Sequence, residues 1–205
     1  IVIVILITIN VIPFAIYLLV LARLIDEYGT TDFGRILTIS TAAFATFLTT
    51  FSMTLNNHTP AACCIAFAIT PLLRRSVPLG PAGLATSGFF AGFAVTLELP
   101  ALAFLAGLGG LLLLTRPRWT LLAFLPAALI PLLALLLTNY LAMGQLLPAY
   151  TEFGGPWYNY PGSHWAKLGT PMAKGIDFAQ ESKDVYAFHL LFGHHGWFSL
   201  TPIWF

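Results

Sequence analysis

The fold is decided by residues 82–114, which read AGLATSGFFAGFAVTLELPALAFLAGLGGLLLL and carry a single charge, Glu98. About 20 apolar residues are enough for one helix to cross a bilayer, so this stretch is too long for a single crossing. Pro100 lacks a backbone donor and disfavours helical geometry in the residue before it. The stretch therefore predicts two short helices, 82–97 and 100–114, joined by a turn at 98–100.

The composition of the whole chain extends this prediction. Of 205 residues, 58% are hydrophobic and 8% are charged, whereas a soluble domain carries roughly 25% charged residues. This excludes a soluble domain, and the apolar content also excludes a disordered chain. A net charge of +1 leaves no basic surface for nucleic acid. We predict an all-α fold, a polytopic transmembrane helical bundle with short paired helices and a long extracytoplasmic loop.

The remaining apolar runs complete the predicted organisation. Region 1–138 is expected to hold about six spans, which besides the pair above are 2–22, 36–55, 60–73 and 119–138, with breaks near 23–35, 56–59, 74–81, 98–100 and 115–118. Region 139–197 is predicted as an aromatic-rich loop, and 198–205 as the start of a further span. Pro126 and Pro131 should kink the sixth span. Because both ends fall in apolar runs, we expect a fragment of a longer polypeptide.

The few charges predict how the spans are oriented. All six arginines fall in three short connections, at Arg23 and Arg35, Arg74 and Arg75, and Arg116 and Arg118. Arginine in short loops tends to stay cytoplasmic. Placing all three connections inside puts Asn57, His58, Glu98 and the 139–197 loop on the extracytoplasmic face of a multi-pass cell-membrane protein.

Three residues on that face are candidates for chemistry. Glu98 is a carboxylate in an apolar run, which favours a cavity or a partner, although the tip of a helical hairpin would also solvate it. His58 and Asn57 precede Pro60, and both could donate hydrogen bonds to a ligand at a helix start. In a purely structural reading, Asn57 or Thr59 caps the helix that follows.

The long loop supplies the other candidates. Its aromatic and polar side chains suit stacking against a sugar, although aromatic belts also occur at the membrane interface without a ligand. Glu152 and His164 are candidate acid–base partners of Glu98 and His58, and the candidate substrate-binding residues, together with Asn57, are Trp157, Tyr158, Tyr160, Trp165 and Lys167.

No metal site is predicted. The spacing of His189, His194 and His195 does not give two imidazoles on one helical face, and Cys63 and Cys64 are adjacent in an apolar run. No cofactor is evident, and this chain offers no support for a divalent metal. Gly107–Gly110 is expected to allow close helix packing.

Three segments resemble the GT-C superfamily of integral-membrane glycosyltransferases, near its protein-mannosyltransferase (family 39) branch. They are 87–102 (SGFFAGFAVTLELPAL), 137–144 (LTNYLAMG) and 195–202 (HGWFSLTP), and the resemblance is spread over about residues 36–205. It implies sugar transfer from a polyprenyl-phosphate carrier to an acceptor at the outer face. The acid of the family's first external loop would precede Ile1. Asn57–Pro60 stands where a second acid is usual, and Glu98 stands where the family often has lysine.

Two functions of different classes therefore remain. The first is a membrane glycosyltransferase whose partners are the bilayer and a polyprenyl-phosphate-linked sugar. The alternative is a non-catalytic scaffold subunit of a larger membrane complex that holds a pigment or haem. A transporter ranks last, because no span carries a charge relay at mid-bilayer depth.

Overall fold

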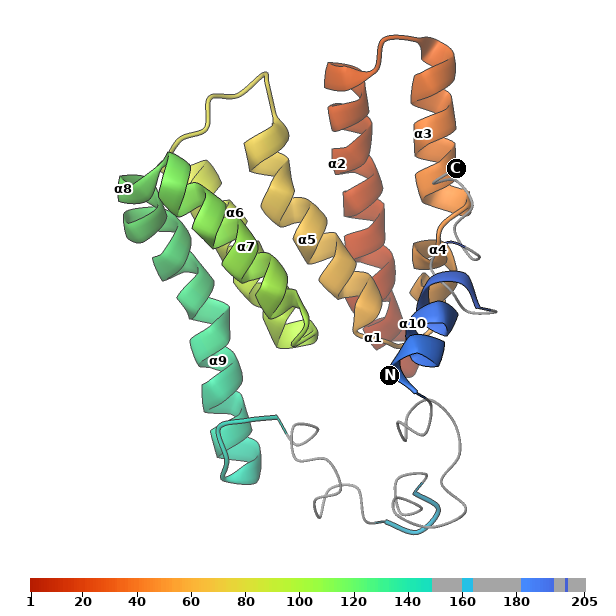
Figure 1. Ribbon diagram of the computed structural model, residues 1–205, viewed down its shortest axis with the longest axis vertical. Coiled ribbons are helices and arrows are strands. Elements are labelled where there is room, and N and C mark those ends of the chain that lie inside the picture. Colours follow the sequence, from red (N-terminus) through yellow and green to blue (C-terminus); the bar gives the residue numbers. More distant parts are fainter. Residues whose placement is uncertain (149–159, 164–181, 194–197, 199–205) are drawn as a thin grey trace. The chain divides into compact units, whose positions relative to one another are not determined.

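The computed structural model describes residues 1–148, 160–163, 182–193 and 198, and it divides into two compact units, Ile1–Ala142 and Met143–Phe205. Over these residues the secondary structure is all helical, which confirms the predicted all-α class (Figure 1). The second unit contributes one described helix, α10 (Lys183–Phe192), which Gly193 terminates.

The first unit contains the helices that position the candidate site. In chain order they are α1 (Val2–Leu6), η1 (Ile7–Val11), α2 (Ile12–Tyr28), α3 (Asp32–Phe44), α4 (Phe47–Ser52), α5 (His58–Leu73), α6 (Pro81–Leu97), α7 (Ala101–Thr115), α8 (Pro117–Trp119), η2 (Thr120–Phe124) and α9 (Leu125–Met143). The two π-helical turns, η1 and η2, continue directly into α2 and α9, so that Val2–Tyr28 and Pro117–Met143 are each one long helix.

The decisive stretch folds as predicted. Helix α6 ends at Leu97, Glu98 is extended with φ −141° and ψ 109°, and Pro100 caps α7. Backbone bonds from Ala101 to Glu98 and from Leu102 to Leu99, both 2.9 Å, close the turn between the helices. The prediction of two helices separated at residues 98–100 is confirmed.

Among the residues that the structure describes, two helices are long and apolar enough to cross a membrane, Val2–Tyr28 and Pro117–Met143. In each of them a π-helical turn precedes a proline, Pro13 or Pro126. A π turn widens the helix just where the proline ring would otherwise meet the carbonyl of the preceding turn. The long helices therefore continue through these prolines.

The single span predicted over 36–55 is wrong as one helix. Ala45 leaves helical geometry, and Thr46 is extended with φ −123° and ψ 159° between α3 and α4. The Thr46 hydroxyl donates to the carbonyl of Ala42 at 3.1 Å, and the Thr49 hydroxyl donates to that of Ala43. These side chains take the acceptors that a continuous helix would use for its own backbone.

The core of the first unit lies between α5, α6, α7 and the η2–α9 helix. Phe124 is fully buried at its centre. A Cβ at Gly88 would lie 2.8 Å from the carbonyl carbon of Phe124, and one at Gly92 would lie 3.0 Å from that of Ala128. Close helix packing therefore depends on Gly88 and Gly92. The expectation for Gly107–Gly110 holds only at Gly109, which is buried and whose Cβ would lie 3.5 Å from the Phe124 ring, whereas Gly107 and Gly110 have no neighbour within 4 Å.

The connections that carry arginine lie at one end of the first unit, and the connections without arginine lie at the other end. Glu27 in the last turn of α2 contacts Arg74 after α5, which brings the first two arginine connections together. Gly88 pairs with Phe124 and Gly92 with Ala128, so α6 and α9 run in the same direction and Arg116–Arg118 lies near the start of α6. All six arginines therefore lie at one end, and the 98–100 turn and the start of α5 lie at the other (Figure 1).

Candidate functional site

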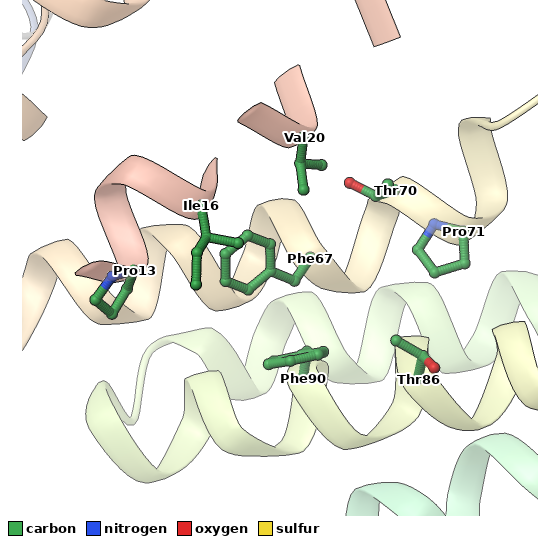
Figure 2. A pocket seen from close by; sticks show the side chains of 8 residues that line it. All are labelled: Pro13, Ile16, Val20, Phe67, Thr70, Pro71, Thr86 and Phe90. Carbon is green, nitrogen blue, oxygen red and sulfur yellow. The ribbon is translucent and has the colours of Figure 1, made fainter. Parts of the chain in front are cut away.

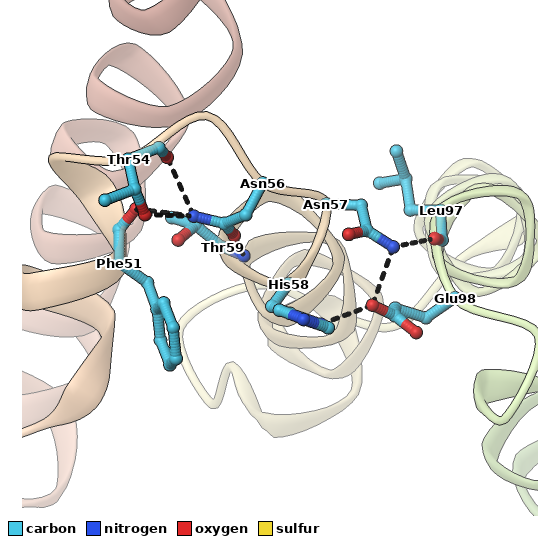
Figure 3. Close-up of polar contacts among 8 residues, drawn as sticks. All are labelled: Phe51, Thr54, Asn56, Asn57, His58, Thr59, Leu97 and Glu98. Carbon is cyan, nitrogen blue, oxygen red and sulfur yellow. Dashed lines mark hydrogen bonds and ion pairs between the residues drawn. The ribbon is translucent and has the colours of Figure 1, made fainter. Parts of the chain in front are cut away.

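Asn57, His58 and Glu98 meet at the end of the first unit opposite the arginines (Figure 3). The Glu98 Oε1 atom accepts a hydrogen bond from Asn57 Nδ2 at 2.7 Å and also contacts His58 Nδ1. Asn57 Nδ2 donates as well to the carbonyl of Leu97 at 2.8 Å. One carboxylate oxygen thus joins the start of α5 to the α6–α7 turn, and we call these three residues the polar junction.

Local capping explains why His58 begins a helix at this point. The Asn56 Oδ1 atom accepts from the backbone N–H of Thr59 at 3.0 Å, while Asn56 Nδ2 donates to the carbonyls of Phe51 and Thr54 at 2.6 and 2.8 Å. Asn56 therefore does the capping that the sequence assigned to Asn57 or Thr59. The Asn57 side chain is released from that role and turns toward Glu98.

The first long helix also forms hydrogen bonds to residues 51–54, the segment that precedes α5. Asn10 is fully buried in η1, and its Nδ2 atom donates to the carbonyl of Thr54 at 2.6 Å and to that of Phe51 at 3.3 Å. Asn10 and Asn56 were missed as supporting residues. An asparagine inside the apolar run 2–22 is costly enough in a membrane to have identified Asn10, whereas no sequence signal distinguishes Asn56 from Asn57.

Within the polar junction, the imidazole is more exposed than the carboxylate, and this arrangement suits proton transfer. The His58 side chain is 61% exposed and that of Glu98 is 26% exposed. The ring of Phe51 contacts the imidazole edge to face, at 5.8 Å between centroids (Figure 3). With Nδ1 facing the carboxylate, the second ring nitrogen is left for an outside group, and the half-buried Glu98 fixes the ring orientation.

The opposite end is held by a second carboxylate. Glu27 follows the apolar run 2–22 and lies in the charged segment that begins at Arg23. Hydrogen bonds from the Ser76 hydroxyl, the Arg75 backbone N–H and the Arg74 side chain lower the pKa of Glu27 to about 2. Arg75 also stacks on the Tyr28 ring, 4.1 Å from its centroid.

Of the remaining predicted site residues, the structure describes only Tyr160. Tyr160 lies in the second unit and is exposed. Glu152, Trp157, Tyr158, His164, Trp165 and Lys167 lie outside the described residues, as do His194 and His195. Among the residues that the structure describes, no three His, Cys, Asp or Glu side chains cluster as metal ligands, and both cysteines are buried and free.

Comparison with known proteins identified no relative of this chain. No family model, no curated protein and no solved structure matches the chain.

Proposed function

We propose that this chain is part of a multi-pass membrane glycosyltransferase that moves a sugar from a polyprenyl-phosphate carrier to an acceptor hydroxyl at the extracytoplasmic face. The observation that carries the proposal is the contact of the exposed His58 imidazole with the Glu98 carboxylate, at the end of the first unit that holds no arginine. An imidazole oriented by a carboxylate is a common arrangement for a general base.

In the proposed step, His58 Nε2 removes the proton of the acceptor hydroxyl. The acceptor oxygen then bonds to the anomeric carbon of the sugar, and the bond from that carbon to the phosphate oxygen breaks. The polyprenyl phosphate leaves with the electron pair. Glu98 and Asn57 are positioning residues here, since Asn57 Nδ2 donates to the Glu98 oxygen that faces the imidazole.

The other candidates keep the roles given to them by the sequence. Lys167 is a candidate substrate-binding residue, and Glu152 or His164 is a candidate acid–base partner. Trp157, Tyr158, Tyr160 and Trp165 would stack against the sugar. General acid–base catalysis typically contributes about 10²–10⁴-fold to a rate, which sets the scale for removing His58.

The test is a transfer assay with labelled polyprenyl-phosphate sugar, using the full-length protein in membranes. We expect His58→Ala to lower transfer at least about 100-fold. We expect Glu98→Gln to lower it less, with little change in the apparent affinity for the carrier. His189→Ala is the matched control, because the proposed step gives His189 of α10 no role, and its loss should leave transfer unchanged.

Absence of transfer and of carrier binding in the wild-type protein would refute the proposed function. That outcome would favour the alternative, a non-catalytic scaffold subunit. One observation supports this alternative: the polar junction links α5 to the α6–α7 turn, so it could serve only to hold the helices together. Visible absorbance of the purified chain would then test for a bound pigment or haem.

A further inference from the structure

An apolar groove runs between α2, α5 and α6, and none of its lining residues belongs to the polar junction (Figure 2). Its volume is about 420 Å³, within the range of small-molecule pockets of about 300–1,000 Å³. The walls are formed by Pro13, Ile16 and Val20 of α2, and by Phe67 and Phe90 of α5 and α6.

The two threonines in this groove do not make it polar. The Thr70 hydroxyl donates to the carbonyl of Ala66 at 2.7 Å, and the Thr86 hydroxyl donates to that of Ala82 at 3.0 Å. Each hydroxyl is thus satisfied within its own helix. No group in the groove calls for a polar ligand, so the groove suits a hydrocarbon chain.

The groove continues toward the arginine end. A second hollow of about 370 Å³ shares Thr70 and Pro71 with the first and is lined by Arg74. Arg74, which directly follows α5, lies seven residues after Phe67, and Arg23 on α2 lies seven residues after Ile16. Residues at this spacing lie on one face of a helix. Both helical walls of the groove therefore end in an arginine.

These arginines carry charge that the protein does not fully neutralise. Arg74 shares Glu27 with Ser76, whereas Arg23, one helical turn before Glu27, is exposed and has no hydrogen bond or ion pair within the described part of the chain. At this end six arginines face three acids, Asp26, Glu27 and Asp32. The excess of three positive charges complements an anionic headgroup.

We propose that the groove binds one anionic phospholipid of the leaflet at the arginine end, with an acyl chain along α2, α5 and α6 and its phosphate between Arg23 and Arg74. The apolar walls accept the chain and the two arginines select the negative headgroup. This site lies apart from the polar junction, and its occupancy does not depend on the proposed transferase activity.

The experiment is native mass spectrometry of the full-length protein released from nanodiscs that contain equal phosphatidylglycerol and phosphatidylcholine. We expect phosphatidylglycerol to be retained preferentially. Arg23→Gln should lower this preference about fivefold, the factor that one arginine near an anionic surface supplies. Arg118→Gln is the matched control, because it removes the same charge from the same end without touching either wall of the groove.

A second pair of variants tests the chain-binding part with all arginines intact. Ile16→Trp fills the groove and should abolish lipid retention, whereas Leu133→Trp, at an exposed position of α9, should not. Soluble glycerol phosphate should not compete with the lipid. Equal retention of the two lipids, equal effects of Arg23→Gln and Arg118→Gln, unchanged retention in Ile16→Trp, or effective competition by glycerol phosphate would each overturn the proposal.

Discussion

At the scale of single residues, two polar side chains anchor the first long helix to the rest of its unit. Asn10 in η1 bonds to the carbonyls of Thr54 and Phe51. Glu27 in the last turn of α2 bonds to the segment after α5, through Arg74, Arg75 and Ser76. Each anchor lies close to one end of α5, so the two together fix the position of the first helix against it.

We predict that Asn10→Ala destabilises the protein by about 1–2 kcal/mol, because it removes the two hydrogen bonds that join η1 to the carbonyls of Phe51 and Thr54 in an apolar surrounding. Thr8→Val is the control, since the Thr8 hydroxyl bonds only to carbonyls of its own helix, at 2.9 and 3.1 Å. The free energy of unfolding in mixed detergent micelles measures both. Equal losses in the two variants would show that the contacts of Asn10 to Phe51 and Thr54 contribute nothing specific.

The Glu27 anchor should respond to pH. Its carboxyl has a pKa of about 2 in the folded protein, below the ordinary value of 4.5. The ionised form therefore stabilises the fold above about pH 4.5, and this contribution is lost as the pH falls from there toward 2. We predict that Glu27→Gln lowers the melting temperature at pH 6, and that the difference from wild type disappears near pH 2. A difference that is independent of pH would contradict this.

At the scale of residues, the sequence shows which side chains could do chemistry more readily than it shows which of them contact one another. Glu98 is visible without a structure as an isolated charge in an apolar run, and Asn57 and His58 are visible in the polar segment before Pro60. Their mutual contact was not derivable, because it depends on whether Asn56 or Asn57 caps α5. Two adjacent asparagines carry identical local preferences, and only tertiary contacts decide between them.

At the scale of helices, the closest contact is between α6 and the η2–α9 helix. Gly88 and Gly92 lie one turn apart and face the backbone of Phe124 and Ala128. A side chain at either position would meet main-chain atoms, which cannot rotate away as a flexible side chain can. The two helices would have to separate, and the packing around the buried Phe124 ring would be lost with them.

We predict that Gly88→Ala and Gly92→Ala each cost about 1–3 kcal/mol through overpacking. Gly107→Ala and Gly110→Ala in α7 are matched controls, because a Cβ at either position meets nothing within 4 Å. These controls should be neutral or stabilising by up to about 1 kcal/mol, since alanine favours helix more than glycine does. Thermal unfolding in detergent would check all four variants, and a stable Gly88→Ala would refute the contact.

The helix boundaries show which sequence signals were sufficient. Pro100, two residues after the charged Glu98, correctly marked the turn between α6 and α7. The threonines between α3 and α4 were weaker signals, because a threonine hydroxyl either bonds within an intact helix, as Thr38 does, or accompanies a break, as Thr46 does. Glycine packing was equally ambiguous, since which glycines meet a neighbour is decided by the arrangement of helices.

At the scale of the whole molecule, the separation of charges between the ends of the first unit is the feature that links fold to function. The chemistry proposed for His58 requires the polar junction to face the extracytoplasmic side, and the lipid site requires the arginines to face the opposite leaflet. Both proposals therefore depend on one orientation. Its basis is the tendency of arginine in short loops to remain cytoplasmic.

Cysteine labelling in sealed, right-side-out membrane vesicles tests this orientation most directly. Leu55→Cys, before the polar junction, and Val77→Cys, among the arginine connections, replace side chains of similar exposure, 56% and 50%. The native Cys63 and Cys64 are buried, so wild type gives the background. We predict that a membrane-impermeant maleimide labels Leu55→Cys in intact vesicles and Val77→Cys only after permeabilisation. Labelling of Val77→Cys in intact vesicles, with or without Leu55→Cys, would contradict the orientation on which both proposals rest.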